Sequence, residues 1–238
     1  MPWQKANSRI KQLVDSDIDF DHHSLFTDVL EMVGLQPDDR VQYFAYGSQI
    51  WAPCFAHRRQ SVATVDHLMR EYCILSYLYR GTDRHPGLVL GLQEQTGAQV
   101  QGMVFDIRAQ DLAPIIAQEM VTNVYYPAWV ITRNHSEHGS QDQESSAARS
   151  AERALTFIAR SCSHHCVRLS LAQQADLILS SGGARGTSLA YFQQTQLALH
   201  QAGVPDERLT ELEQLINRRL AEHAVPLDGR HLDDPERA

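Results

Sequence analysis

The chain has 238 residues, of which 43% are hydrophobic and 21% charged, and its formal net charge is −8. This composition is typical of a globular protein and excludes wholesale disorder. It lacks the basic footprint that nucleic acids and anionic membranes require, so we expect neither as a partner. The sequence shows no secretory signal and no apolar run long enough to span a bilayer, which favours a cytoplasmic protein with reduced cysteines.

The first half of the chain reads mainly as strands. Residues 1–40 mix polar and apolar positions and predict an N-terminal extension, partly ordered, with a short helix closed by Gly34. A strand begins at Val41 and breaks at Gly47 and Ser48. β-branched, aromatic and aliphatic residues predict three further strands, over residues 72–79, 88–92 and 99–108.

The second half turns helical. Apolar residues at helical spacing predict a helix over residues 111–121, followed by strands at 129–132 and 154–159 with a Ser-rich loop between them. Three helices follow: one capped by Ser170 and Gln173, one over residues 186–201, and one that begins after Asp206. Residues 226–238 form a polar tail. Strands without regular βαβ alternation predict an α+β domain, residues 41–225, with an antiparallel or mixed sheet or small barrel.

Two local features are candidates for chemistry. The strand that ends in Tyr46-Gly47-Ser48 leaves a turn with free backbone N–H groups, which suits a carboxylate or an oxyanion but also describes a plain strand end. Glu119 lies beside the apolar stripe of the helix over 111–121. Its carboxylate is either solvated at the edge of the stripe or pushed inward, and burial would raise its pKa toward neutrality, as a general base requires.

Other motifs point to function less directly. The segment SCSHHC, Cys162 to Cys166, contains metal-ligand residue types, but no second pair at zinc-finger spacing accompanies it, so no metal site is predicted. The Gly-rich segment 180–188 lacks the GK[ST] ending of a P-loop and reads as a turn between helices. No G-x-S-x-G elbow is present, which disfavours a serine hydrolase.

The motifs in order resemble a known family. YGSQIW, YRGTDRHPGLVLGL, GMVFDI, QEMVTNVYYPAWV, GTSLAYFQQT and GVPDERLTEL follow one another between Val41 and Leu215. This series resembles the ChaC-type γ-glutamylcyclotransferases, whose fold is a small β-barrel flanked by helices. The family's usual forms are YGSLIW, an RGT…PG loop, REMVTGxYxPxW and GxNxxYL.

The chain departs from these forms at four positions, Gln49, Gln118, Asn123 and Ser188, where the family has Leu, Arg, Gly and Asn. Gln49 shifts the loop toward the YGSN of related cyclotransferases. Because neighbouring residues on a helix point about 100° apart, we expect Gln118 not to share the pocket face with Glu119. The family's Asn at position 188 would cap the helix or bond to the nearby loops, and Ser188 is expected to cap the helix with little loss.

The resemblance implies an enzyme that cuts glutathione into 5-oxoproline and cysteinylglycine without a cofactor or metal. The substrate's own α-amine attacks its γ-carbonyl, so holding the γ-glutamyl group bent is a large part of catalysis. Glu119 then serves as general base and acid. The remaining implied substrate-binding residues are those of the turn, the RGT loop and the segment after the helix: Tyr46, Gly47, Ser48, Gln49, Ile50, Arg80 and Tyr125.

Three other readings stay open from the sequence. The chain is a cyclotransferase for another γ-glutamyl amine or amino acid, or an inactive relative that only binds γ-glutamyl compounds, or a small metal-binding protein that uses Cys162 to Cys166. An activity panel with 5-oxoproline as the readout separates the first two from a glutathione enzyme, and metal analysis tests the third.

Overall fold

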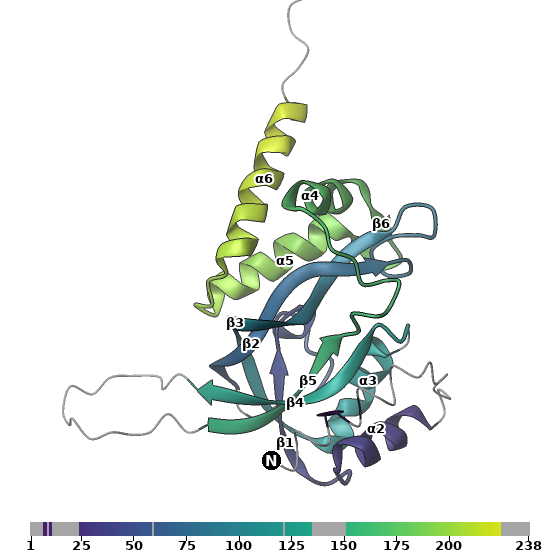
Figure 1. Cartoon of the computed structure of the whole chain (residues 1–238), viewed down its shortest axis with the longest axis vertical. Helices are drawn as coiled ribbons and strands as arrows, with labels where there is room; N and C mark the ends of the chain where they lie inside the picture. Colours follow the sequence, from purple (N-terminus) through teal and green to yellow (C-terminus); the bar gives the residue numbers. More distant parts are fainter. Residues whose placement is uncertain are drawn as a thin grey trace, which may run out of the picture.

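Five strands close into a barrel at the centre of the molecule (Figure 1). The computed structural model describes residues 7–8, 10, 24–58, 60–120, 122–134 and 151–224. The strands, in barrel order, are β1 (Arg40–Ala45), β3 (Gly87–Arg108), β2 (Gln60–Ser76), β4 (Tyr125–Asn134) and β5 (Ala151–Ala159). β1 pairs parallel with β5, and the other neighbours pair antiparallel. The predicted α+β class, a small mixed barrel flanked by helices, is confirmed.

β2 and β3 are much longer than the sequence predicts. The strands predicted at 88–92 and 99–108 are two parts of β3, and the strand predicted at 72–79 begins at Gln60 and ends at Ser76. The polar middle of β3 is exposed and shows no apolar alternation. Residues 95–98 within it have no paired residue in β2, and the pairing resumes on either side of them. The pairing register shifts between Asp66 and Leu68 and again at Tyr72 to Ile74, and such bulges blur a period of two.

Helices α2 (Leu25–Val33) and α3 (Ala113–Glu119) pack together beside the barrel, with α2 also against β4 (Figure 1). The predicted stop of α2 is confirmed, because Gly34 takes the left-handed conformation with φ 72°. The helix predicted over 111–121 consists of a 3₁₀ turn, η2 (Ala109–Leu112), followed by α3. Pro114 sits in the first turn of α3, where its missing N–H costs nothing.

Three helices cover the opposite side of the barrel (Figure 1): α4 (Leu171–Ser180), α5 (Ser188–Gln201) and α6 (Glu207–Ala224). The capping box of Ser170 and Gln173 is confirmed, and Asp206 accepts the Leu209 N–H at 3.2 Å at the start of α6. The helix predicted from 186 begins two residues later. Residues 182–187 form a small hairpin instead, β6 (Gly182–Gly183) and β7 (Gly186–Thr187).

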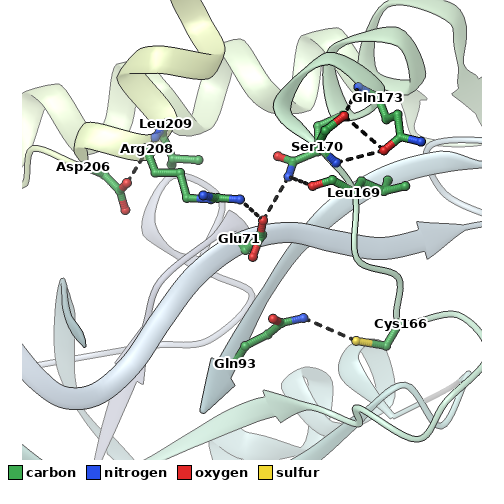
Figure 2. A network of polar contacts seen from close by, with 10 residues as sticks. Glu71, Gln93, Cys166, Leu169, Ser170, Gln173, Asp206, Arg208 and Leu209 are labelled. Atoms are coloured by element: carbon green, nitrogen blue, oxygen red, sulfur yellow. Dashed lines mark hydrogen bonds and ion pairs between the residues drawn. The ribbon is translucent and has the colours of Figure 1, made fainter. Parts of the chain in front are cut away.

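A buried polar network fastens the C-terminal helices to β2. Figure 2 shows Glu71 of β2 bonded to Arg208 of α6. The Gln174 amide of α4 donates to the same Glu71 oxygen at 3.0 Å. The neighbouring residue, Arg70, is fully buried and pairs with Asp206 at 2.8 Å. Two adjacent residues of β2 with opposite charges therefore hold the first turn of α6.

The predicted extension contacts the barrel. Trp129 of β4 donates its indole N–H to the Val33 carbonyl at 3.1 Å, and the Asn7 side chain exchanges two hydrogen bonds with the Trp129 backbone. The division into residues 1–40, 41–225 and 226–238 stays a prediction. The Ser-rich loop and the polar tail lie outside the described residues. No helix in the described part of the chain has both the length and the apolar character to cross a membrane.

Candidate active site

The turn after β1 lies at one wall of a cavity of about 340 Å³. Residues Ser48–Ile50 form one 3₁₀ turn, in which Ile50 N donates to the Gly47 carbonyl at 3.0 Å and Trp51 N to the Ser48 carbonyl at 3.1 Å. Among the described residues, the backbone N–H groups of Ser48 and Gln49 have no protein acceptor. Both residues line the cavity, and their N–H groups are available as donors; that the turn binds an anion stays a prediction.

The buried side chain of Arg70 fixes the backbone at the start of this turn. Its Nε donates to the Tyr46 carbonyl at 2.7 Å, and its Nη2 donates to the Gln101 carbonyl. Since Arg70 also pairs with Asp206, one guanidinium connects the turn, β3 and α6. The position of Tyr46 and Gly47 therefore depends on a buried charge that the sequence alone does not mark as functional.

Glu119 ends α3 and lines the same cavity. Ile115, Ile116 and Met120 are buried around it, so the helix is fixed by its apolar side. The Glu119 side chain reaches the cavity, but protein surrounds it, and this burial raises its pKa from the model-compound value of 4.5 to about 7. Hydrogen bonding from Gln118, the nearby Gln49 amide and the charge of Arg185 limit the rise. A carboxyl group that titrates near neutrality suits proton transfer in both directions.

Gln118 corrects one expectation. It lines the cavity together with Glu119, and its Nε2 donates to Glu119 Oε1 at 3.2 Å. The expectation assumed a continuing helix, but α3 has seven residues and ends at Glu119. At a helix end beside a wide cavity, two neighbouring side chains about 100° apart both border the opening.

Gln49 is buried in the turn opposite. Its Oε1 accepts the Cys54 N–H at 3.1 Å, while its Nε2 has no hydrogen-bond partner among the described residues. The Gln49 side chain lies near enough to Glu119 to lower the pKa of that carboxyl. The departure from the family's Leu thus places an amide donor beside Glu119.

Aromatic side chains form much of the cavity wall. Tyr125 donates from its hydroxyl to the Leu90 carbonyl at 2.6 Å, and Trp51 donates from Nε1 to Thr195 Oγ1 at 3.2 Å. Burial, together with the Glu119 charge, raises the pKa of four tyrosines that line the cavity, which therefore stay neutral: Tyr43, Tyr46, Tyr125 and Tyr191. These walls present more apolar than polar surface, a common design of small-molecule sites.

Arg80 and the β6–β7 hairpin form the rim. Arg80 lies over the Tyr191 ring at 5.2 Å and donates from Nη1 to the Arg185 carbonyl at 2.6 Å. The hairpin meets the loop after β2 backbone to backbone, because a Cβ atom on Gly183 would lie 2.6 Å from the nitrogen and the oxygen of Gly81. This contact requires glycine at position 183, whereas Gly81 is required by its own loop, because a Cβ atom there would lie 1.9 Å from the Gly87 nitrogen.

The structure brings most of the predicted site residues to one cavity. Its lining includes Glu119, Tyr46, Gly47, Ser48, Gln49, Arg80 and Tyr125. Ile50 is not among the lining residues; it packs half-buried against the hydrophobic core. Sequence reasoning did not propose Tyr43, Trp51, Gln118 or Arg185 as site residues. Trp51 and Gln118 lie within the motifs YGSQIW and QEMVTNVYYPAWV, which could have marked them, whereas Tyr43 and Arg185 lie outside the six motifs.

The SCSHHC segment reaches the cavity through one residue, His165. Cys162 is exposed, and Cys166 is half-buried and accepts a hydrogen bond from Gln93 at 3.6 Å (Figure 2). His165 borders the cavity and packs edge-on against Tyr77. Within the described ranges, no three His, Cys, Asp or Glu side chains are grouped to hold a metal ion. The expectation that the chain needs no metal stays a prediction.

Comparisons with known proteins agree with the family that the motifs resemble. The glutathione-specific gamma-glutamylcyclotransferase of Escherichia coli (strain K12) is 26% identical over 194 residues, which are 79% of this chain and 78% of that protein. Two crystal structures of a γ-glutamylcyclotransferase specific to glutathione from yeast align with TM-scores of 0.65 and 0.63, at 18% and 17% identity. They cover 75% and 76% of this chain and 96% and 99% of the yeast chains, and at this identity they establish the fold alone. The profile of the family described as ChaC-like protein matches residues 41–219, so the chain belongs to the ChaC-like protein family.

Proposed function

We propose that the chain is a γ-glutamylcyclotransferase that converts glutathione into 5-oxoproline and cysteinylglycine, with Glu119 as general base and acid. Family membership and the names of the relatives support the reaction and the substrate. The observation that carries the assignment of Glu119 is its place in the cavity, as a carboxyl group with a pKa of about 7 opposite the free N–H groups of Ser48 and Gln49.

The reaction needs one proton shuttle and one oxyanion site. The substrate's α-amine forms a bond to its γ-carbonyl carbon, and the bond from that carbon to the cysteine nitrogen breaks. From the uncharged amine, one proton stays on the lactam nitrogen and the other moves through Glu119 to the leaving nitrogen. The N–H groups of Ser48 and Gln49 stabilise the tetrahedral oxyanion, and the cavity holds the γ-glutamyl group bent for attack.

Arg80 is proposed as a contact for a substrate carboxylate, and Tyr46, Gly47 and Tyr125 as walls of the γ-glutamyl pocket. The cavity volume of about 340 Å³ falls in the range of small-ligand sites. We further propose a cytoplasmic protein without a nucleic-acid partner. The net charge of −8 supports the absence of a nucleic-acid partner, and the cytoplasmic location rests on the expected substrate.

The test is to incubate the purified protein with glutathione and to measure 5-oxoproline and cysteinylglycine. Parallel reactions with γ-glutamyl amino acids and a γ-glutamyl amine decide the substrate class. The Gln49 amide is the specific reason to include them, because it differs from the family's Leu beside Glu119. If none of these compounds releases 5-oxoproline, the proposed activity is refuted, and the alternative of an inactive protein that only binds γ-glutamyl compounds remains.

A further inference from the structure

Arg185 is held at the rim of the cavity by several contacts. It sits at the tip of the β6–β7 hairpin, where Arg185 N donates to the Tyr79 carbonyl at 2.9 Å and Ala184 N to the Leu78 carbonyl at 3.1 Å. Its carbonyl accepts from Arg80, and its guanidinium stacks over the Tyr79 ring at 4.0 Å. Although exposed, the side chain has a defined place.

From there a chain of two hydrogen bonds leads to Glu119. Arg185 Nη1 donates to Gln118 Oε1 at 3.1 Å, and Gln118 Nε2 donates to Glu119 Oε1 at 3.2 Å. The amide is thus used at both ends, as acceptor from a cation and as donor to a carboxylate. A cation on the carbonyl end polarises the amide and strengthens its bond to the carboxylate. This bond restrains the Glu119 carboxylate at Oε1.

We propose that Arg185 is a positioning residue for Glu119 and acts through the Gln118 amide. The inference rests on the proposed function, in which Glu119 transfers the proton. It also accounts for the departure at 118: the family's usual residue there is Arg, and this chain instead places Gln118 between Glu119 and a guanidinium from a distant hairpin.

The groups that face Glu119 come from five parts of the fold. They belong to β1, the turn after it, β4, the hairpin and α5: Tyr43, Tyr46, Cys54, Tyr125, Arg185 and Tyr191. The four tyrosines are neutral because their pKa values are raised, and burial also raises the pKa of the Cys54 thiol. Arg185 is the cation in this set, and its charge lowers the pKa of Glu119 against the effect of burial.

The test follows the titration of Glu119 directly. Proteins with ¹³C-labelled glutamate carboxyl groups are titrated by NMR, and the Glu119 resonance is assigned by its loss in Glu119→Gln. In Arg185→Met and in Gln118→Met we expect the midpoint to rise above that of the natural protein. Arg185→Lys, which keeps the charge, should recover part of the shift. The double variant should shift by less than the sum of the single shifts, because both residues belong to one chain of contacts.

The kinetic readout is the pH profile of kcat/KM. Its acid limb should move with the NMR midpoint, so that Arg185→Met loses about two- to fivefold at pH 7, with the effect mainly in kcat. The matched control is Arg153→Met. Arg153 also stacks on an aromatic ring at 4.0 Å, that of Trp129, but lies outside the cavity lining. This variant should leave both the midpoint and the profile unchanged.

Two results would overturn the proposal. The first is an unmoved Glu119 midpoint in Arg185→Met; a rise in KM with that midpoint unmoved would make Arg185 a direct substrate contact instead. The second is an Arg153→Met variant that moves the midpoint equally. Because the NMR titration does not depend on turnover, a protein without cyclotransferase activity refutes the proposed function and still answers this question.

Discussion

Ser188 accepts the backbone N–H of Leu88 at 3.0 Å, which connects the first residue of α5 to the start of β3. The same hydroxyl lies 2.9 Å from Ser181 Oγ and 3.2 Å from the Arg80 carbonyl. The helix is capped by Thr187, whose Oγ1 accepts Ala190 N at 3.0 Å. The prediction that Ser188 caps α5 is therefore wrong: its hydroxyl instead connects α5 to β3 and to the Arg80 carbonyl.

Ser188→Ala should destabilise the protein by about 1–3 kcal/mol, because it leaves the buried Leu88 N–H without its acceptor. Chemical denaturation measures the loss. The control is Ser180→Ala: the Ser180 hydroxyl is exposed and bonds back to its own helix, so the change should stay within about 0.5 kcal/mol. Equal stability of the two variants would contradict the role given to Ser188.

Arg70→Met should cost about 3–5 kcal/mol, since it leaves Asp206 and two buried carbonyls without their cation. Thermal or urea unfolding checks this. The control is Arg133→Met. Arg133 also forms an ion pair with an aspartate, Asp66, but that pair lies at the surface. This substitution should have a much smaller effect. If the protein tolerates both changes alike, Arg70 does not hold the turn.

Glu119→Gln should lower turnover of glutathione by about 10²–10⁴, and by more if the group acts twice, because the amide cannot carry the proton. Circular dichroism should show an unchanged fold. Glu71→Gln serves as the comparison: Glu71 is buried but outside the cavity lining, so its loss should reduce stability while turnover per folded molecule persists. Near-normal activity of Glu119→Gln would refute the mechanism.

The pKa of Glu119 also predicts how stability depends on pH. The folded value of about 7 lies above the unfolded value, so the folded state binds more protons between these values, and stability falls as pH rises through that window. Glu119→Gln lacks this penalty. At pH 8 it should be more stable than the natural protein by on the order of 1–3 kcal/mol, and at pH 4 the two should match. Urea titrations at both pH values make the comparison.

Activity should survive exhaustive chelation. In the proposed reaction the attacking amine and the carbonyl belong to one substrate, and the protein supplies a carboxylate and backbone donors, so the mechanism assigns no step to a Lewis acid. The assay is 5-oxoproline release after dialysis against chelator, with zinc added back. Activity that is lost and then restored by zinc would revive the metal reading of Cys162 to Cys166.

The sequence predicts the barrel's elements better than their lengths. Capping residues mark helix ends through local chemistry, which is why Gly34, Ser170 and Asp206 were placed correctly. The extent of β2 and β3 depends on backbone pairing between exposed, bulged segments, which no side-chain pattern records. At Asn123, by contrast, the residue type itself fits the local backbone conformation. Where the family has Gly, this chain has the residue that best tolerates the left-handed region, and its φ is 53°.

Within the site, the sequence identifies residues that lie in a motif. Tyr46, Gly47, Ser48 and Glu119 belong to such segments and line one cavity. Gln118 was misjudged because the end of α3 depends on packing. Arg185 could not be found at all, since 66 positions of chain separate it from Glu119 and only the hairpin brings the two near each other.

The contact between Gly183 and Gly81 limits which substitutions the rim of the cavity can accept. Gly183 and Gly81 touch through their main chains, so the geometry there is set by atoms that no substitution removes. Even one added methyl group would lift the hairpin and carry Arg185 away from Gln118, although it introduces no charge and touches no substrate. A side chain at position 183 therefore requires movement of the main chain at residues 79–81, so this part of the entrance tolerates changes in its side chains better than a change of this glycine.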